Sequence, residues 1–219
     1  MCGRYTLTAP ADDLAAEFGV EVPADYEPRY NIAPQQPVAV IGPDADGRPR
    51  LAFLRWGLVP WWSSPEAAEG GPINARAETL SSKPTFRDAF RERRCLIVAD
   101  GFYEWKREGA VRVPFRFHLR GGGLLAFAGL WERWEKGAEP LYTCAIVTTA
   151  ASDAVASIHD RMPAILPRGA RERWIDPGAD ATTLRALLRP LEDPGLVVDR
   201  VSRLVNSVAN DSPDCIEPA

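Results

Sequence analysis

The sequence contains few of the residues from which metal sites and disulfide frameworks are built. It has only two histidines, His118 and His159, and its four cysteines are far apart in the chain. A zinc site would need ligands from scattered positions, and a disulfide framework is not typical of a cytosolic chain of this size. We therefore expect no metal and no cofactor. The three cysteines far from the N-terminus are expected to be small apolar core residues: Cys95, Cys144 and Cys215.

Long apolar runs and a secretory signal are also lacking. No run approaches the ~20 apolar residues of a membrane span, and the start has no basic segment followed by an apolar one. We expect a cytoplasmic protein. With 219 residues, 46% of them hydrophobic, the chain is long enough for one domain over residues 1–219 with a sizeable core. A polar C-terminal tail from about residue 208 is expected to fray.

Lysine is nearly missing, and the net charge is only −4. This balance argues against a generic nucleic-acid binder with a wholly basic domain. The segment 83–94 nevertheless has five bases against two acids, so the sequence is still compatible with a local basic groove. Almost all the bases are arginine, the side chain that forks onto phosphates.

Strand-like runs outnumber helical ones, and most are joined by hairpin-length links. We therefore predict an α+β fold with a mixed or antiparallel, barrel-like sheet and short flanking helices. The predicted helices cover 8–19 (capped by Thr8, with Gly19 after its end), 84–94, about 152–157, GARERWID and ATTLRALLRPL. The predicted strands are 37–41, 50–59, CLIVADGFYEW, VPFRFHL, LLAFAGLW, LYTCAIVTT and a closing LVVDRVSRLV.

A cysteine directly follows the initiator methionine. If Met1 is removed, Cys2 carries an α-amine and a thiol on adjacent carbons. An α-amine with a pKa of ~7.7–8.0 is partly unprotonated at neutral pH, and it attacks an aldehyde to give a Schiff base. The thiol can then add to that imine and close a five-membered thiazolidine ring. Position alone is equally consistent with an ordinary cysteine near the start of the chain.

The motif GFYEW places an acid between two aromatic side chains. Partial desolvation of Glu104 by Tyr103 and Trp105 would raise its pKa and suit it to proton transfer. The alternative is an edge-strand glutamate paired with Lys106.

Two further motifs carry polar residues. His159 lies in the Pro-bounded segment SIHDRMP beside Arg161, where a histidine can shuttle protons or contact phosphate. His118 has strand alternation around it and is interpreted as structural. The motif NARAE puts polar side chains at alternate positions, so they share one face if the segment is extended: Asn74, Arg76 and Glu78.

MCGRY at the start, followed in order by NARAE, GFYEW and HDRMP, closely resembles the SRAP family, the "SOS-response-associated peptidase" proteins. The resemblance extends from Cys2 to at least Pro163. It implies the SRAP fold and a sensor of abasic sites in single-stranded DNA. In that family the N-terminal cysteine captures the abasic aldehyde as a thiazolidine DNA–protein crosslink, which shields the lesion.

The resemblance also implies roles for individual residues. Cys2 would be the nucleophile through both amine and thiol, and Asn74 would orient the reacting centre. Glu104 would shuttle protons, and His159 would assist opening of the sugar ring. The implied DNA-binding residues are Arg4, Arg76 and Arg161 for phosphates, and Trp61, Trp62 and Trp105 for base stacking.

The expected partner is therefore single-stranded DNA with an abasic site, bound by a monomer that joins the nucleoid on damaged DNA. Two other functions stay open: an N-terminal-nucleophile thiol peptidase and a non-covalent single-stranded DNA binder. A peptidase is disfavoured because only Met1 precedes Cys2. Strand cleavage by β-elimination from the imine is expected at most as a minor lyase activity.

Overall fold

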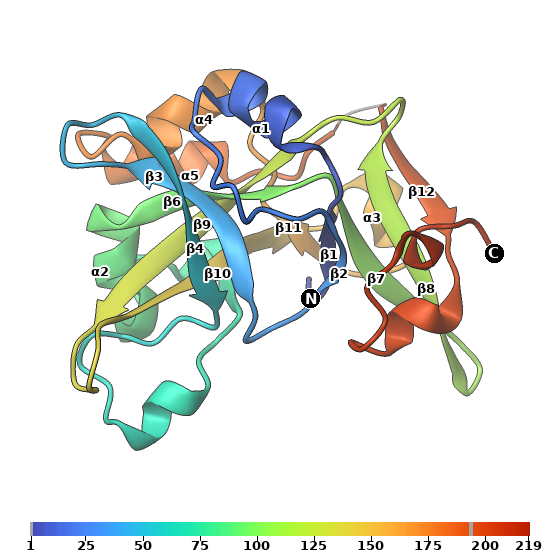
Figure 1. Ribbon diagram of the computed structural model, residues 1–219, viewed down its shortest axis with the longest axis horizontal. Helices are drawn as coiled ribbons and strands as arrows, with labels where there is room; N and C mark the ends of the chain where they lie inside the picture. Colours follow the sequence, from blue (N-terminus) through green and yellow to red (C-terminus); the bar gives the residue numbers. More distant parts are fainter. Residues whose placement is uncertain (1, 193–194) are drawn as a thin grey trace.

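Five strands close into a mixed barrel in the structure, a computed structural model that describes residues 2–192 and 195–219 (Figure 1). The barrel order is β10–β4–β3–β6–β9, and β9 pairs back onto β10. The β4–β10 pair is parallel and the other pairs are antiparallel. This confirms the predicted barrel-like sheet. The barrel strands are β3 (Pro37–Pro43), β4 (Pro49–Trp56), β6 (Arg94–Ala99), β9 (Leu125–Trp134) and β10 (Leu141–Ala150).

Two three-residue strands are added at the far end of β10. β5 (Asn74–Arg76) runs parallel to β10, and β11 (Arg161–Pro163) runs antiparallel to it. Thr148 of β10 is level with both Arg76 and Pro163. This register brings the NARAE and HDRMP motifs, 80 residues apart in the chain, to the same end of the barrel.

A second, antiparallel sheet packs beside the barrel in the order β12–β8–β7–β1–β2. The chain passes from β6 in the barrel to β7 in this sheet at Asp100, whose carboxylate accepts hydrogen bonds from Thr6 and Thr8. The predicted single run CLIVADGFYEW is therefore two strands in two sheets. The strands are β1 (Tyr5–Leu7), β2 (Arg29–Ile32), β7 (Gly101–Glu108), β8 (Val111–Leu119) and β12 (Leu196–Arg200).

The core fills the barrel and the space between the two sheets. Tyr5 of β1 packs edge-to-face on Trp56 and Phe127 of the barrel, which holds the sheets together. The three remote cysteines have no exposed surface, so their assignment as apolar core residues is confirmed: Cys95, Cys144 and Cys215.

Short helices cover the sheets, as predicted. Gly19 ends α1 with a φ of +65°, which glycine adopts without steric cost. The predicted Thr8 cap is wrong, because Pro10 holds the N-cap position while the Thr8 hydroxyl donates to Asp100. The helices are α1 (Ala11–Phe18), α2 (Pro84–Glu92), α3 (Asp153–Ala156), α4 (Arg168–Ile175) and α5 (Ala181–Leu187), with 3-10 turns η1 (Glu66–Glu69), η2 (Ala77–Thr79), η3 (Arg203–Asn206) and η4 (Pro213–Cys215). No helix in the described ranges is both long and apolar enough to cross a membrane.

The C-terminal segment differs from its prediction in two ways. The closing strand ends at Arg200 and is followed by the turn η3. The tail expected to fray is packed instead, with Cys215 fully buried. Asp211 holds it in place by accepting the backbone N–H groups of Tyr30 and Asn31, which satisfies the free edge of β2.

Candidate active site and nucleic-acid interface

Cys2 lies just before β1, beside the strand that carries Glu104. Tyr5 is level with Phe102, and the Tyr103 N–H donates to the Arg4 carbonyl at 3.0 Å. Continued past the end of β1, this register puts Glu104 level with Gly3. The GFYEW motif is thereby placed next to the N-terminal cysteine.

Asn74 joins the N-terminus to the barrel. Its Nδ2 donates a 2.8 Å hydrogen bond to the Cys2 carbonyl oxygen. Its Oδ1 is buried and has no hydrogen-bond partner among the described residues. The side chain thus fixes the backbone of Cys2 and keeps one acceptor available. The predicted common face of the NARAE motif is only partly formed, because the strand ends at Arg76 and Glu78 lies in η2.

Glu104 is buried in an interior strand of the second sheet. Its side chain is 4% exposed, and β7 lies between β1 and β8. Burial raises the pKa of Glu104 to about 7, against 4.5 for a free side chain. The alternative of an edge-strand glutamate paired with Lys106 is therefore wrong, because β7 is an interior strand. A carboxyl group with this pKa is suited to proton transfer near neutral pH.

His159 faces Glu104 from the loop between α3 and β11. Its Nε2 lies 3.9 Å from the Glu104 Oε2, and its Nδ1 accepts the Arg161 backbone N–H at 3.0 Å. A ring that accepts at Nδ1 carries its proton on Nε2 when neutral, directed at Glu104. Burial lowers the pKa of His159, which favours this neutral form. The exposed Asp160 carboxylate, 3.0 Å from Nδ1, favours protonation of the ring.

The Cys2 thiol is fully buried. Burial, followed by the charge of Glu104, raises its pKa well above that of a free thiol. The side chain is therefore protonated at neutral pH, and it needs a base to act as a nucleophile.

Arg4 and Trp105 form one unit on the other face of the second sheet. The Arg4 guanidinium carbon lies 5.7 Å from the centre of the Trp105 ring. Its Nη1 donates to Asn31 Oδ1 at 2.7 Å and to the Val205 carbonyl at 2.8 Å. The Trp105 Nε1 donates to Asn206 at 2.7 Å. Both side chains are thus held by the C-terminal segment.

The other two predicted phosphate contacts differ from each other. Arg161 forms a two-pronged ion pair with Glu78, at 2.6 and 3.0 Å, and also donates to the Thr148 carbonyl. Arg76 is exposed on β5 and is level with Thr148 of β10, whereas Arg161 is level with Ala150. Arg76 is therefore the more accessible cation beside the Cys2 site.

Trp61 and Trp62 are exposed, as predicted, with 55% and 46% of their surface accessible. Their loop is fixed near Thr143, which accepts the Val59 N–H at 2.9 Å. Thr143 is five residues from Thr148 along β10, or about 16 Å at the rise of a strand. The pair therefore lies outside the cluster of Cys2, Asn74, Glu104 and His159.

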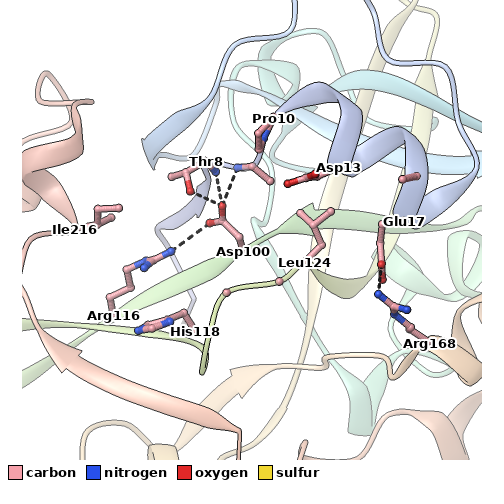
Figure 2. Close-up of a pocket in the computed structure, with 15 residues that line it drawn as sticks. Thr8, Pro10, Asp13, Glu17, Asp100, Arg116, His118, Leu124, Arg168 and Ile216 are labelled. Carbon is pink, nitrogen blue, oxygen red and sulfur yellow. Dashed lines mark hydrogen bonds and ion pairs between the residues drawn. The ribbon is translucent and has the colours of Figure 1, made fainter.

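A cavity of about 900 Å³ lies between α1, β8 and the glycine loop 121–123 (Figure 2). None of the predicted site residues lines it. Figure 2 shows two ion pairs among its lining residues, Asp100 with Arg116 and Glu17 with Arg168. The candidate site indicated by the four motifs lies elsewhere, at Cys2. The described residues include no group of three or more His, Cys, Asp or Glu side chains that could hold a metal ion.

Sequence reasoning missed the residues that support the Arg4–Trp105 unit. Asn31, Asn206 and Asp211 belong to none of the four motifs, and their contacts join residues that are 27, 101 and 180 positions apart in the chain. The sequence contains no local pattern that could have identified them.

Comparison with known proteins gives the family of the chain. The family model described as SOS response associated peptidase (SRAP) matches residues 1–208. The chain is 44% identical to the abasic site processing protein YoqW of Bacillus subtilis, with 99% of each chain covered. It is 33% identical to the mouse abasic site processing protein HMCES, covering 100% of this chain and 76% of the relative. A crystal structure of a Bacteroides thetaiotaomicron protein superposes with a TM-score of 0.90 at 25% identity, with both chains fully covered. The chain belongs to the SRAP family.

Proposed function

We propose that the protein processes abasic sites in single-stranded DNA by forming a covalent thiazolidine with Cys2 once Met1 has been removed. The observation that carries the proposal is the convergence of four motif residues from distant parts of the chain: Cys2, Asn74, Glu104 and His159. Its relatives YoqW and HMCES are named abasic site processing proteins, which supports the same substrate.

The first bond forms between the Cys2 amine and the aldehyde carbon of the ring-opened sugar. The amine nitrogen attacks that carbon, and loss of water from the carbinolamine leaves an imine. Asn74 holds the Cys2 carbonyl and so restricts the direction of the amine. Its spare buried Oδ1 is an acceptor available to an amine N–H at this step.

The second bond forms between the Cys2 sulfur and the imine carbon. Because its pKa is raised, the thiol must lose a proton as it attacks, and the imine nitrogen must gain one. Glu104, with a pKa of about 7, can accept the proton from sulfur and return it to nitrogen. The ring closes without a cofactor, and the only molecule released over both steps is water.

His159 is assigned to the opening of the sugar ring, which precedes attack of the Cys2 amine on the aldehyde. A closed abasic sugar opens when its ring oxygen gains a proton and its anomeric hydroxyl loses one. The neutral ring carries an Nε2 proton beside Glu104, so the two side chains can supply the acid and the base.

The DNA contacts combine a few cations with a stacking surface. We assign Arg4 and Arg76 to phosphates and Trp105 to a base. Arg161 is assigned to a phosphate as well, in its ion pair with Glu78. A narrow arginine-lined path of this kind is compatible with a net charge of −4.

The test is a denaturing gel of the protein with an abasic oligonucleotide and its undamaged twin, after intact mass has shown that Met1 is absent. We expect a slow band on the abasic strand alone, abolished in Cys2→Ala. Cys2→Ser keeps the amine and a hydroxyl in place of the thiol, so it preserves the size and polarity of the side chain better than Cys2→Ala and should likewise give no product that survives denaturation. No band from protein with a free Cys2 would contradict the proposal. If the protein gives no band and DNA binding survives in Cys2→Ala, the protein is a non-covalent binder. Cleavage of peptides that does not depend on DNA would indicate a peptidase.

A further inference from the structure

The segment that follows β12 exposes apolar side chains beside the Arg4–Trp105 unit. Leu204 is 46% exposed and Val208 is 52% exposed. Asn206 lies between them and accepts the Trp105 Nε1–H at 2.7 Å. In Figure 1 this red segment lies against β7 and β8, and the 2.8 Å bond from Arg4 to Val205 joins it to the N-terminal strand.

The segment is rigid although its surface is exposed. The fully buried Asn31 side chain donates to the Ser207 carbonyl at 2.9 Å and to the Asn210 carbonyl at 2.6 Å. The Asn210 side chain donates in turn to the Leu204 carbonyl at 2.8 Å. A segment held by buried hydrogen bonds presents its side chains in one fixed arrangement, which reduces the entropy lost on binding.

The local charge matches a phosphate strand. Residues 200–210 contain two arginines and no acid, although residues 170–219 as a whole carry a net charge of −3. The two acids that flank this range in the sequence are paired, Asp199 with His118 and Asp211 with Arg29. Apolar side chains flanked by an amide and an arginine fit a nucleobase, which has an apolar face and a polar edge.

We propose that residues 203–208 form a wall of the DNA site, in which Leu204 and Val208 contact an unstacked base of the strand next to the abasic position. The wall continues the surface of Trp105, and Arg203 lies at its end for a backbone phosphate. This inference rests on the proposed function and adds a contact that none of the four motifs contains.

The test compares serine substitutions at exposed apolar side chains inside and outside the wall. Val208→Ser and Leu204→Ser are made in a Cys2→Ala background, so that binding of a fluorescent abasic single strand is measured by anisotropy without crosslinking. The matched control is Val198→Ser, because Val198 is 41% exposed on β12 and outside the wall. Circular dichroism and thermal melting check that each variant is folded.

We expect the double variant Leu204→Ser/Val208→Ser to lose about fivefold or more in affinity, the scale of one base contact. The slope of affinity against salt should stay unchanged, because an apolar contact releases no counterions. Val198→Ser should bind like the parent. A folded double variant with parental affinity, or an equal loss in Val198→Ser, would overturn the wall while leaving crosslinking intact. Two negative results together would overturn the proposed function and the wall with it: no crosslink from the protein with Cys2 intact, and no binding of the abasic strand by the Cys2→Ala parent.

Discussion

Two ionisable side chains of the Cys2 site have pKa values shifted by burial in opposite directions, and both shifts favour the neutral form. The pKa of Glu104 is raised to about 7, and that of His159 is lowered. A neutral His159 can donate from Nε2, while Glu104 is divided between its two forms near neutral pH. The pair is thus poised to give and take protons near neutral pH.

The pH dependence of crosslinking tests this at the residue scale. Because the Glu104 carboxylate is the proposed base, the rate should fall as pH drops through about 7. Glu104→Gln should slow crosslinking by about a hundredfold or more and remove this fall in rate near pH 7. The fall in rate caused by protonation of the Cys2 amine, with a pKa of ~7.7–8.0, should remain. Stopped-time gels across pH, with anisotropy for binding, provide the measurement. An equal loss of DNA affinity, or a fall in rate near pH 7 that persists in Glu104→Gln, would assign Glu104 a structural role.

Among the elements, α2 and α4 are fixed by one buried side chain. The Arg94 guanidinium, 3% exposed, donates to backbone carbonyls of Phe90 and Arg91 at the end of α2. It also donates to carbonyls of Trp174 and Asp176 at the end of α4. A single cation thus donates to carbonyls at the C-terminal ends of both helices.

Arg94→Met should therefore destabilise the protein. Methionine fills similar space but leaves buried carbonyls without donors, at a cost of about 3 kcal/mol or more. Urea unfolding followed by circular dichroism measures the change. The control Arg91→Ala, on the exposed side of α2, should stay within about 0.5 kcal/mol of the parent. Unfolding midpoints that coincide for the two variants would contradict this account of the helix ends.

Elements with a clear local signal could be predicted, and those without one could not. The long apolar runs of β9 and β10 and the Gly19 stop of α1 indicated their structures directly. The strands β1 and β5 have only three residues each, which is too short for a pattern, and their pairing depends on partners about 20 to 100 residues away. The C-terminal tail was predicted to fray from its polar composition, but Asp211 and Cys215 bind it to β2 and the second sheet.

The candidate site divides in the same way. Cys2, Asn74 and Glu104 could be selected because each lies in a short motif, and a resemblance connected the motifs. The wall at 203–208 could not be selected, because Asn31 and Asn206 have ordinary surroundings in the sequence. Their importance depends on hydrogen bonds that only the folded chain brings about.

At the scale of the whole molecule, a net charge of −4 means that DNA binding must depend on a few local cations. Arg76→Ala should weaken single-strand binding and reduce the slope of log affinity against log salt by about 1. Arg48→Ala, in the exposed turn between β3 and β4, is the control and should leave both unchanged. Anisotropy titrations at several salt concentrations provide the comparison. A parental slope in Arg76→Ala would remove this residue from the phosphate contacts.

The central claim is that both the amine and the thiol of Cys2 bond to one carbon of the abasic sugar. The most direct test is the intact mass of the crosslinked product before and after treatment with borohydride. Our account predicts a mass one water below the sum of Met1-free protein and oligonucleotide, unchanged by borohydride, because a thiazolidine has no C=N bond to reduce. A gain of two hydrogens would show that the product is an imine, and a free protein mass with intact oligonucleotide would show that no covalent bond forms. Either result would contradict capture by Cys2 as a thiazolidine.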